Sequence, residues 1–294
     1  MFFMSLTVQD ILRNEIDGIL VINMDSNAAR YEAFKQATRD CLPECKVERV
    51  SAVVGRNVPG FAALPWFTER TGTRAKAWAG AAGCALSHRK CIETARSRGW
   101  RNVLIMEDDA VPCSPDAAAE LLHTALTTLK GGYMLYLGHT RPLPHGTRQA
   151  AVGNAELWRV DGVLATHAYI VTAGAYEELL SRMPTEKTVW PWMARYKAVD
   201  VYYRDYVAAS GRLPVFSVYP NIFLQAGGVS DITGKIVPDD TYSCHRTPYP
   251  RNSFCGFFYR LAYPCRYIKV RLNSLRTLLR ARWHGFPGYR RRKQ

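Results

Sequence analysis

The chain has 294 residues, of which 48% are hydrophobic and 22% are charged, so it can bury a core and lacks the composition of a disordered protein. Its net charge of +14 is unevenly distributed: residues 241–294 hold thirteen Lys and Arg and no Asp or Glu, which leaves 26 basic and 25 acidic residues in the first 240. This nearly neutral body argues against a nucleic-acid groove in the main fold, because phosphate backbones require clustered cations. We expect no nucleic-acid partner.

The N-terminal segment, the longest apolar runs and the cysteines indicate where in the cell the protein is located. The N-terminal apolar stretch has no positive segment and is interrupted by Gln9 and Asp10, which is not typical of a secretory signal. No run reaches the roughly 18 apolar residues that a membrane span needs. The eight cysteines form no CxxC zinc pattern, and we expect most of them to be reduced. These features predict a cytoplasmic protein that is at most peripheral at a membrane.

Apolar runs alternate with helical patterns along the chain. Strands are predicted at residues 18–22, 102–106, 133–137 and 168–171, and helices at 28–39, 80–96, 115–130 and 173–182. This alternation predicts an α/β fold with a mostly parallel central sheet, in which ligands bind at the carboxyl ends of the strands. We expect one domain over residues 15–245, followed by a basic helical tail over 246–294.

Polar segments follow two of these strands. One is Asn23-Met24-Asp25, and the other is the carboxylate triplet Glu107-Asp108-Asp109. Three adjacent carboxylates repel one another unless a cation or solvent offsets their charge, and Mg²⁺ or Mn²⁺ prefers such oxygen ligands. If strand geometry persists, Glu107 and Asp109 point to one side and can share a metal, while Asp108 faces away. The alternative is a solvated acidic turn.

Several ordered segments resemble one known pattern. They are residues 21–25 (VINMD) followed by Arg30, 83–88 (GCALSH), 104–110 (LIMEDDA), 135–138 (LYLG), 167–169 (HAY), 199–200 (VD), and 218–220 (VYP) through Gln225 to 230–232 (SDI). In this order and spacing they resemble glycosyltransferase family 25, over roughly residues 17–235. That family includes bacterial lipooligosaccharide galactosyltransferases and collagen galactosyltransferases.

The resemblance implies a GT-A-like nucleotide-sugar-binding fold, a UDP-sugar donor that is often UDP-galactose, and inversion at the anomeric carbon. The carboxylate triplet would stand in place of a DxD motif, with Asp109 and Glu107 as ligands of Mn²⁺ or Mg²⁺. The acceptor would be a hydroxyl of a glycan, glycolipid or glycoprotein, as in lipopolysaccharide biosynthesis. Two departures leave the donor open, at residues 80–83 (GAAG) and at 26–29 (SNAA).

An inverting transfer needs a base that deprotonates the acceptor hydroxyl. Asp200 is the first candidate, and Asp231 and His167 are the alternatives. A helix cap is the competing role for Asp200. The candidates for donor binding are Asn23, Asp25, Arg30, Ser87, His88, Glu107, Asp108 and Gln225.

Some of these donor-binding candidates have specific expected roles. Asn23 and Asp25 can bind uracil or ribose, with a turn role as the competitor. Arg30 can orient Asp25 or neutralise phosphate. Ser87 and His88 are chosen on the resemblance, against the ordinary alternative of a buried, hydrogen-bonded histidine.

An aromatic stretch lies beside Asp200. Sugars place their C–H faces against aromatic rings, so this stretch is a candidate acceptor platform, whereas packing in the core is the usual role of such residues. Its members are Trp190, Trp192, Tyr196, Tyr202 and Tyr203.

The tail predicts a basic amphipathic helix from Arg266 to Trp283, with Pro264 before it and Gly285 after it. Its apolar positions are Ile268, Leu272, Leu275 and Leu279, and its basic positions are Arg266, Lys269, Arg276 and Arg280. Such a helix can lie on an anionic membrane surface, aided by the basic residues 290–293. The alternatives are docking of its apolar face onto the catalytic domain and a nucleic-acid arm.

Two other function classes fit the same residues. A metal-dependent phosphohydrolase can use the carboxylates, and an inactive scaffold can retain a transferase fold. A nicotinamide-dependent oxidoreductase is disfavoured, because no GxGxxG follows the first strand.

Overall fold

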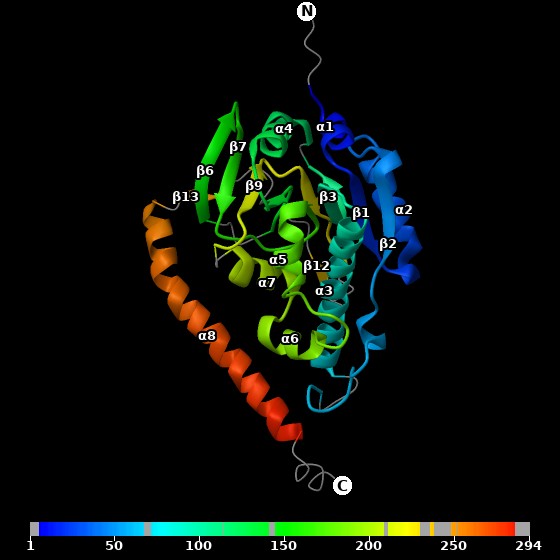
Figure 1. The fold of residues 1–294 in the computed structure, drawn as a ribbon, viewed down its shortest axis with the longest axis vertical. Helices are drawn as coiled ribbons and strands as arrows, with labels where there is room; N and C mark the ends of the chain where they lie inside the picture. Colours follow the sequence, from blue (N-terminus) through cyan, green and yellow to red (C-terminus); the bar gives the residue numbers. More distant parts are fainter. Residues whose placement is uncertain are drawn as a thin grey trace, which may run out of the picture.

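A nine-stranded sheet forms the centre of the computed structural model, which describes residues 6–67, 72–113, 115–140, 145–208, 211–229, 236–237, 248–250 and 252–285 (Figure 1). The order across the sheet is β13-β6-β7-β9-β5-β8-β3-β1-β2. The strands of this sheet are β1 (Gly18–Asn23), β2 (Val47–Ser51), β3 (Asn102–Glu107), β5 (Met134–Tyr136), β6 (His145–Val152), β7 (Ala155–Val160), β8 (Ala168–Thr172), β9 (Val215–Tyr219) and β13 (Tyr249–Pro250). Two small antiparallel pairs join β4 (Ala110–Pro112) to β10 (Phe223–Gln225) and β11 (Gly228–Val229) to β12 (Ile236–Val237).

The direction of each strand determines which strand ends lie side by side at the edge of the sheet. Seven of the nine strands run the same way, and β7 and β8 run against them, so four of the eight neighbouring pairs are antiparallel. The expected α/β class and the mostly parallel sheet are therefore confirmed, with two reversed strands that the sequence did not predict. Because β8 is reversed and pairs with β3, its first residues lie beside the last residues of β3.

The helices are α1 (Val8–Glu15), α2 (Ala28–Thr38), α3 (Thr73–Ser97), α4 (Ala119–Thr128), α5 (Tyr176–Leu180), α6 (Val189–Tyr196), α7 (Val199–Tyr202) and α8 (Phe254–Gly285). A π-helical segment, Tyr203–Ala208, continues from α7. The four predicted helices in the body all occur. Two of them begin with a 3₁₀ turn, before α4 and α5, and α3 begins seven residues earlier than predicted.

Two apolar cores lie on opposite faces of the sheet. On β1, Leu20 and Ile22 belong to the core that contains α3, α5 and α6, whereas Ile19 and Val21 belong to the core that contains α1 and α4. Alternate residues of a strand point to opposite faces, so burial on both faces requires a continuous apolar run. Each buried aliphatic side chain contributes roughly 1.5–3 kcal/mol. This burial explains why the apolar runs of the sequence predicted β1 and β3 closely.

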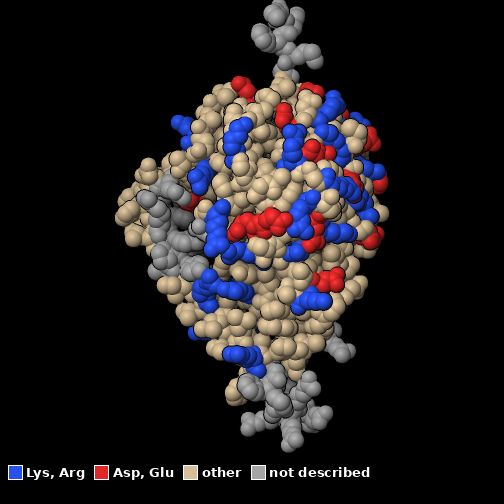
Figure 2. All heavy atoms as spheres, in the orientation of Figure 1, with Lys and Arg blue, Asp and Glu red and all other residues tan. Residues whose placement is uncertain are grey.

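The C-terminal helix is longer than predicted. α8 begins at Phe254, ten residues before Pro264, so the expectation that Pro264 marks its start is wrong. Within the described residues, no helix is both long and apolar enough to span a bilayer. On the face shown in Figure 2, basic and acidic residues are intermingled over the upper body. The division into a 15–245 domain and a 246–294 tail remains a prediction.

The cysteines largely behave as small apolar residues. Cys41, Cys45, Cys84 and Cys91 are free. Burial raises the pKa of Cys41 to about 12 and that of Cys91 further still. Cys113, which follows β4, is disulfide-bonded and is an exception to the expectation that most cysteines are reduced.

Candidate active site

A cleft of about 960 Å³ opens at the carboxyl ends of β1 and β3, where α2, α3, the loop after β2 and the loop after β10 surround it. Eight residues predicted for the site line this cleft: Asn23, Arg30, Ser87, His88, Glu107, Asp108, Asp109 and Gln225. The predicted residues Asp25, His167 and Asp200 are not part of its lining. The sheet edge therefore brings together the segments that the sequence motifs had singled out.

One wall of the cleft depends on a close backbone contact. A Cβ atom on Gly83 would lie 2.3 Å from the carbonyl oxygen of Val53, and one on Gly55 would lie 1.8 Å from that of Ala79. The hydroxyl of Ser87 accepts a hydrogen bond from the Val53 amide (2.8 Å) and donates one to the Gly83 carbonyl (2.7 Å). Ser87 thus fixes the loop after β2 against α3 and shapes the wall.

The carboxylate triplet does not continue the strand. β3 ends at Glu107, and the next two residues form a turn. Arg30 binds both of them, with Nε 3.0 Å from Asp108 and Nη2 3.0 Å from Asp109. The expectation that Asp108 faces away from Asp109 is therefore wrong, because the strand alternation on which it depended stops at Glu107.

Asn23 and Asp25 are held by side chains of neighbouring elements, and their binding of uracil or ribose stays a prediction. The Asn23 side-chain amide donates to Asp108 (2.6 Å), so this residue fixes a carboxylate of the triplet. Asp25 is largely exposed and accepts from Arg49 (2.6 Å), not from Arg30. Arg49 also donates to the Asn23 oxygen (2.7 Å). No motif indicated Arg49, which reaches these residues only because β2 pairs with β1.

The two carboxylate oxygens of Asp109 differ in their hydrogen-bond partners. Gln225 donates to Oδ2 (3.0 Å), which Arg30 also contacts, while the buried Oδ1 has no hydrogen-bond partner in the described part of the chain. Burial, with the nearby charge of Glu107, raises the pKa of Asp109 to about 7 in spite of these two partners. A buried carboxylate oxygen of this kind is a suitable ligand for a hard cation.

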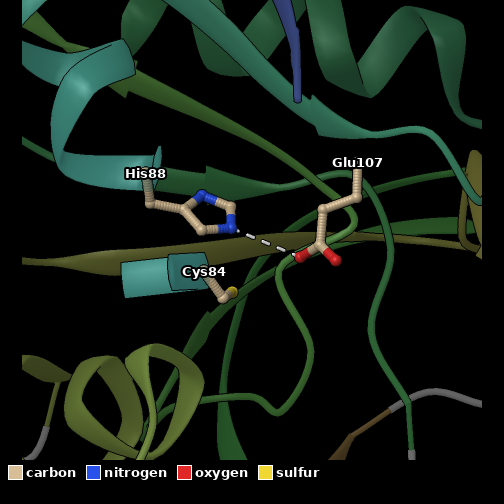
Figure 3. A group of neighbouring side chains, drawn as sticks. All are labelled: Cys84, His88 and Glu107. Atoms are coloured by element: carbon tan, nitrogen blue, oxygen red, sulfur yellow. Dashed lines mark hydrogen bonds and ion pairs between the residues drawn. The ribbon is translucent and has the colours of Figure 1, made fainter. Parts of the chain in front are cut away.

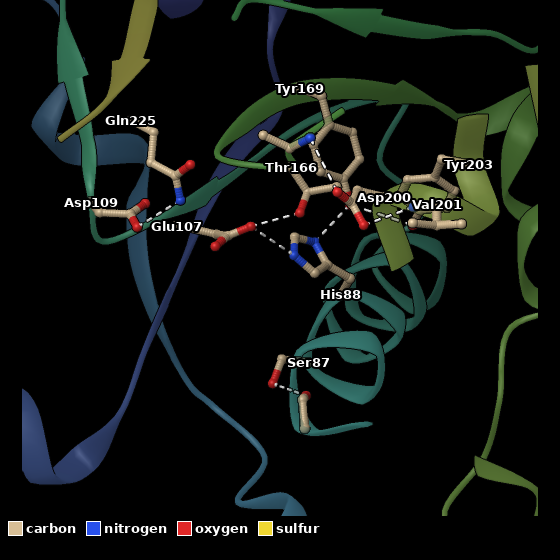
Figure 4. A network of polar contacts seen from close by, with 12 residues as sticks. Ser87, His88, Glu107, Asp109, Thr166, Tyr169, Asp200, Val201, Tyr203 and Gln225 are labelled. Atoms are coloured by element: carbon tan, nitrogen blue, oxygen red, sulfur yellow. Dashed lines mark hydrogen bonds and ion pairs between the residues drawn. The ribbon is translucent and has the colours of Figure 1, made fainter. Parts of the chain in front are cut away.

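Glu107 is held by a chain of polar side chains, Thr166, His88 and Tyr169 (Figure 4). Its Oε1 accepts from the Thr166 hydroxyl (2.6 Å) and lies 3.3 Å from Nε2 of His88. Nδ1 of His88 lies 2.8 Å from the hydroxyl of Tyr169. Burial by itself would raise the pKa of Glu107, but the hydrogen bond and charge of His88, together with Thr166, lower it to about 2. Glu107 is thus kept ionised.

A second set of metal-ligating atoms also includes Glu107. Ligand atoms of Cys84, His88 and Glu107 all lie within 4.8 Å of one another (Figure 3). Cys84 and His88 are four residues apart on α3 and so share a face of that helix. Sulfur and imidazole ligands favour softer metals such as Zn²⁺, whereas carboxylates suit Mg²⁺ and Mn²⁺. Among the described residues this is the only group of three or more such side chains that meets this distance, and the carboxylate triplet does not meet it. Glu107 is the carboxylate that this group shares with the pair predicted from the sequence, Asp109 and Glu107.

The three candidate bases occupy different positions. Asp200 is half-buried in the first turn of α7, where Oδ1 accepts from the Val201 amide (2.7 Å) and Oδ2 from the Ala165 amide (3.4 Å). Burial raises its pKa. In Figure 4 it lies across Thr166 and His88 from Glu107. His167 is fully buried, with Nε2 3.2 Å from the Phe223 carbonyl oxygen. Asp231 lies outside the described residues.

The aromatic stretch does not form a sugar platform. Four of its rings are almost fully buried and pack in the core beside α3: Trp190, Trp192, Tyr202 and Tyr203. The expectation of an acceptor surface there is wrong, because these rings fill the space between α3, α6 and α7.

A family profile described as glycosyltransferase family 25 (LPS biosynthesis protein) matches residues 16–191. Among solved structures, the chain is similar to A197 from STIV, with 9% identity and a TM-score of 0.35 over 80% of this chain and 96% of that one. It is also similar to mannose-1-phosphate geranyltransferase from Thermus thermophilus, with 12% identity and a TM-score of 0.34 over 70% of this chain and 74% of that one. No curated protein shows a significant match to the chain.

Proposed function

This chain belongs to glycosyltransferase family 25, whose profile covers more than half of it, and on that premise we propose that it is an inverting, metal-assisted enzyme of GT-A-like fold. It transfers a hexose, such as galactose, from a UDP-sugar to a hydroxyl of a glycan or glycoconjugate. The donor occupies the cleft beside α3, with its diphosphate toward the carboxylate triplet.

The observation that carries this proposal is the state of Asp109. Its Oδ1 is buried without a partner in the described structure, while Arg30 and Gln225 fix Oδ2. Glu107 and Asp108 add two further carboxylates, against which Arg30 supplies one positive charge. These residues fit Mn²⁺ or Mg²⁺, held by Asp109 and Glu107. When bound, the cation supplies positive charge to the departing diphosphate.

The protein's own residues prepare this arrangement. Arg30 and Asn23 hold the turn after β3, and His88 and Thr166 keep Glu107 ionised and pointing in one direction. Preorganised charge of this kind lowers the barrier more than charge that must reorient during the reaction.

Asp200 lies outside the cleft lining, across Thr166 and His88 from Glu107, and is our proposed base. It takes the proton of the acceptor hydroxyl while that oxygen bonds to the anomeric carbon and the bond from that carbon to the UDP oxygen breaks. Its burial raises its pKa, which makes it a better proton acceptor than an exposed aspartate. The alternatives, Asp231 and His167, remain candidates.

The family description as a lipopolysaccharide biosynthesis protein supports our proposal for the acceptor class. We propose a glycan or glycolipid acceptor.

The test is turnover of a panel of nucleotide-sugars with Mn²⁺, with and without glycan acceptors. A transferase consumes a UDP-sugar only when an acceptor is present and forms a glycosylated product. Sugar release at the same rate without any acceptor would instead indicate a phosphohydrolase. Failure to bind UDP under every metal condition would leave only the inactive scaffold.

A further inference from the structure

One side of α8 is attached to the rest of the protein. The Ser274 hydroxyl donates to the carbonyl oxygen of Arg195 on α6 (2.9 Å), and both Ser274 and Ala281 are 4% exposed. The guanidinium of Arg271 lies over the ring of Tyr206, 5.1 Å from its centroid. Small side chains allow close approach here, and these contacts fix which face of α8 points outward.

The outward side carries a stripe of exposed apolar residues in the described part of α8. Its members are 51–78% exposed: Phe254, Phe258, Leu261, Ile268, Leu272, Leu275, Leu279 and Trp283. They recur at intervals of three, four or seven residues, which places them on one face of a helix. The alternative in which the apolar face docks onto the catalytic domain is therefore wrong for the described part of α8. Soluble monomers rarely expose apolar surface of this extent, so the stripe calls for a partner.

The charges around the stripe limit what that partner can be. Arg276, Arg280 and Arg282 are exposed beside it, and α8 contains no Asp or Glu. The spacing of the stripe would suit a coiled coil between two copies of the chain. Two such helices would bring arginines together without any carboxylate to pair with them, which opposes self-association. The partner must combine an apolar interior with negative charge.

We propose that α8 lies in the surface of an anionic lipid bilayer, with the apolar stripe among the acyl chains and the flanking arginines at the phosphates. Arginine stems can bury their methylenes while the guanidinium groups stay at the headgroups, and Trp283 suits the interface. A straight helix of 32 residues is about 48 Å long, so lipid rather than a small protein pocket can cover the whole stripe.

This arrangement would bring the cleft close to the membrane. α8 packs on α6 through Ser274 and the Arg195 carbonyl, and α6 packs in turn against α3. Lys76, in the first turn of α3, lines the cleft. The consequence that a membrane-embedded acceptor is presented to the cleft rests on the proposed function, whereas the lipid binding itself does not.

The experiment is sedimentation of the full-length protein with vesicles of phosphatidylcholine alone or with 30 mol% phosphatidylglycerol, an arbitrary anionic fraction of roughly the level found in cell membranes. The test variant is Leu272→Gln/Leu275→Gln/Leu279→Gln, which alters only exposed side chains. Its matched control is Leu6→Gln/Val152→Gln, which removes exposed apolar groups elsewhere. We expect binding to the anionic vesicles only, a loss of at least tenfold in the test variant, and none in the control.

Two further measurements keep the outcome clear. Vesicles should shift the tryptophan emission of the wild type to the blue, and Trp283→Phe should remove this shift. Thermal unfolding of the leucine variant should match that of the wild type.

Equal binding to neutral and anionic vesicles, or no binding to anionic vesicles at low salt, would overturn the proposal. So would a dimer in solution that the leucine substitutions dissociate, since a second copy would then cover the stripe. UDP binding should stay unchanged in every variant, which separates failure here from failure of the proposed function.

Discussion

Nη2 of Arg30 lies 3.0 Å from Oδ2 of Asp109, and the same guanidinium contacts Asp108 through Nε. One positive charge thus serves two carboxylates, with Glu107 as a third nearby. The remaining negative charge is what a divalent cation would offset, so the stability of the turn should depend on both Arg30 and metal.

Arg30→Met should lower the free energy of unfolding in EDTA by about 2–4 kcal/mol, because removal of one partner leaves half-buried carboxylates uncompensated. Mn²⁺ should restore part of this loss. The measurement is urea unfolding with Mn²⁺ and with EDTA. Arg98→Met is the matched control, since Arg98 pairs with Glu48 at the surface and such pairs contribute at most about 1 kcal/mol. Equal stability of the two variants in EDTA would refute the shared role of Arg30.

Asp109→Asn should lower the affinity for UDP at least tenfold, or about 1.4 kcal/mol, in Mn²⁺ and leave it unchanged in EDTA. The amide is nearly isosteric but loses the charge that a hard cation requires. Titration calorimetry measures both conditions, with Asp40→Asn as the control because that carboxylate is 90% exposed.

The same titration distinguishes the two ligand sets. If Mn²⁺ is held by Asp109 and Glu107, Cys84→Ser should bind UDP as the wild type does. Loss of metal-dependent binding in Cys84→Ser with none in Asp109→Asn would assign the metal to Cys84, His88 and Glu107.

His88→Ala should change how stability varies with pH. The pKa of Glu107 is lowered from 4.5 to about 2 in the folded protein, so its ionised form adds stability above about pH 4.5, and this is lost as pH falls toward 2. Without His88, burial should raise that pKa. The difference in unfolding free energy between wild type and variant should therefore be large at pH 7 and shrink toward pH 3. In a Glu107→Gln background the difference should no longer vary with pH, whereas a persistent pH dependence there would assign it to another group.

The sequence predicted the parts of the fold that depend on local pattern. The run at 102–106 gave β3 almost to the residue, because burial on both faces demands continuous apolar side chains. The reversal of β8 depends on pairing between distant segments, and it is this reversal that brings Thr166 to Glu107. Arg49 was missed because its position beside Asn23 likewise depends on the pairing of separate segments, β2 with β1.

The tail shows a second limit. Amphipathic spacing predicted the apolar positions of α8 correctly, but spacing cannot tell which face docks on the domain. Ser274 and Ala281 decide this, because small side chains let α8 approach α6 while the larger apolar residues point outward.

Asp200→Asn should reduce turnover by two or more orders of magnitude while leaving the affinity for UDP and Mn²⁺ nearly unchanged, because a base acts in the transition state and contributes little to donor binding. Asparagine can still accept hydrogen bonds from the amides of Val201 and Ala165, so α7 should keep its position. Turnover is measured with a saturating UDP-sugar and acceptor, and Glu186→Gln serves as an exposed carboxylate control. A matching loss of UDP affinity would mean that Asp200 shapes the cleft instead. Unchanged turnover would transfer the role of base to Asp231 or His167, and the same assay on Asp231→Asn and His167→Gln would then identify which of them accepts the proton.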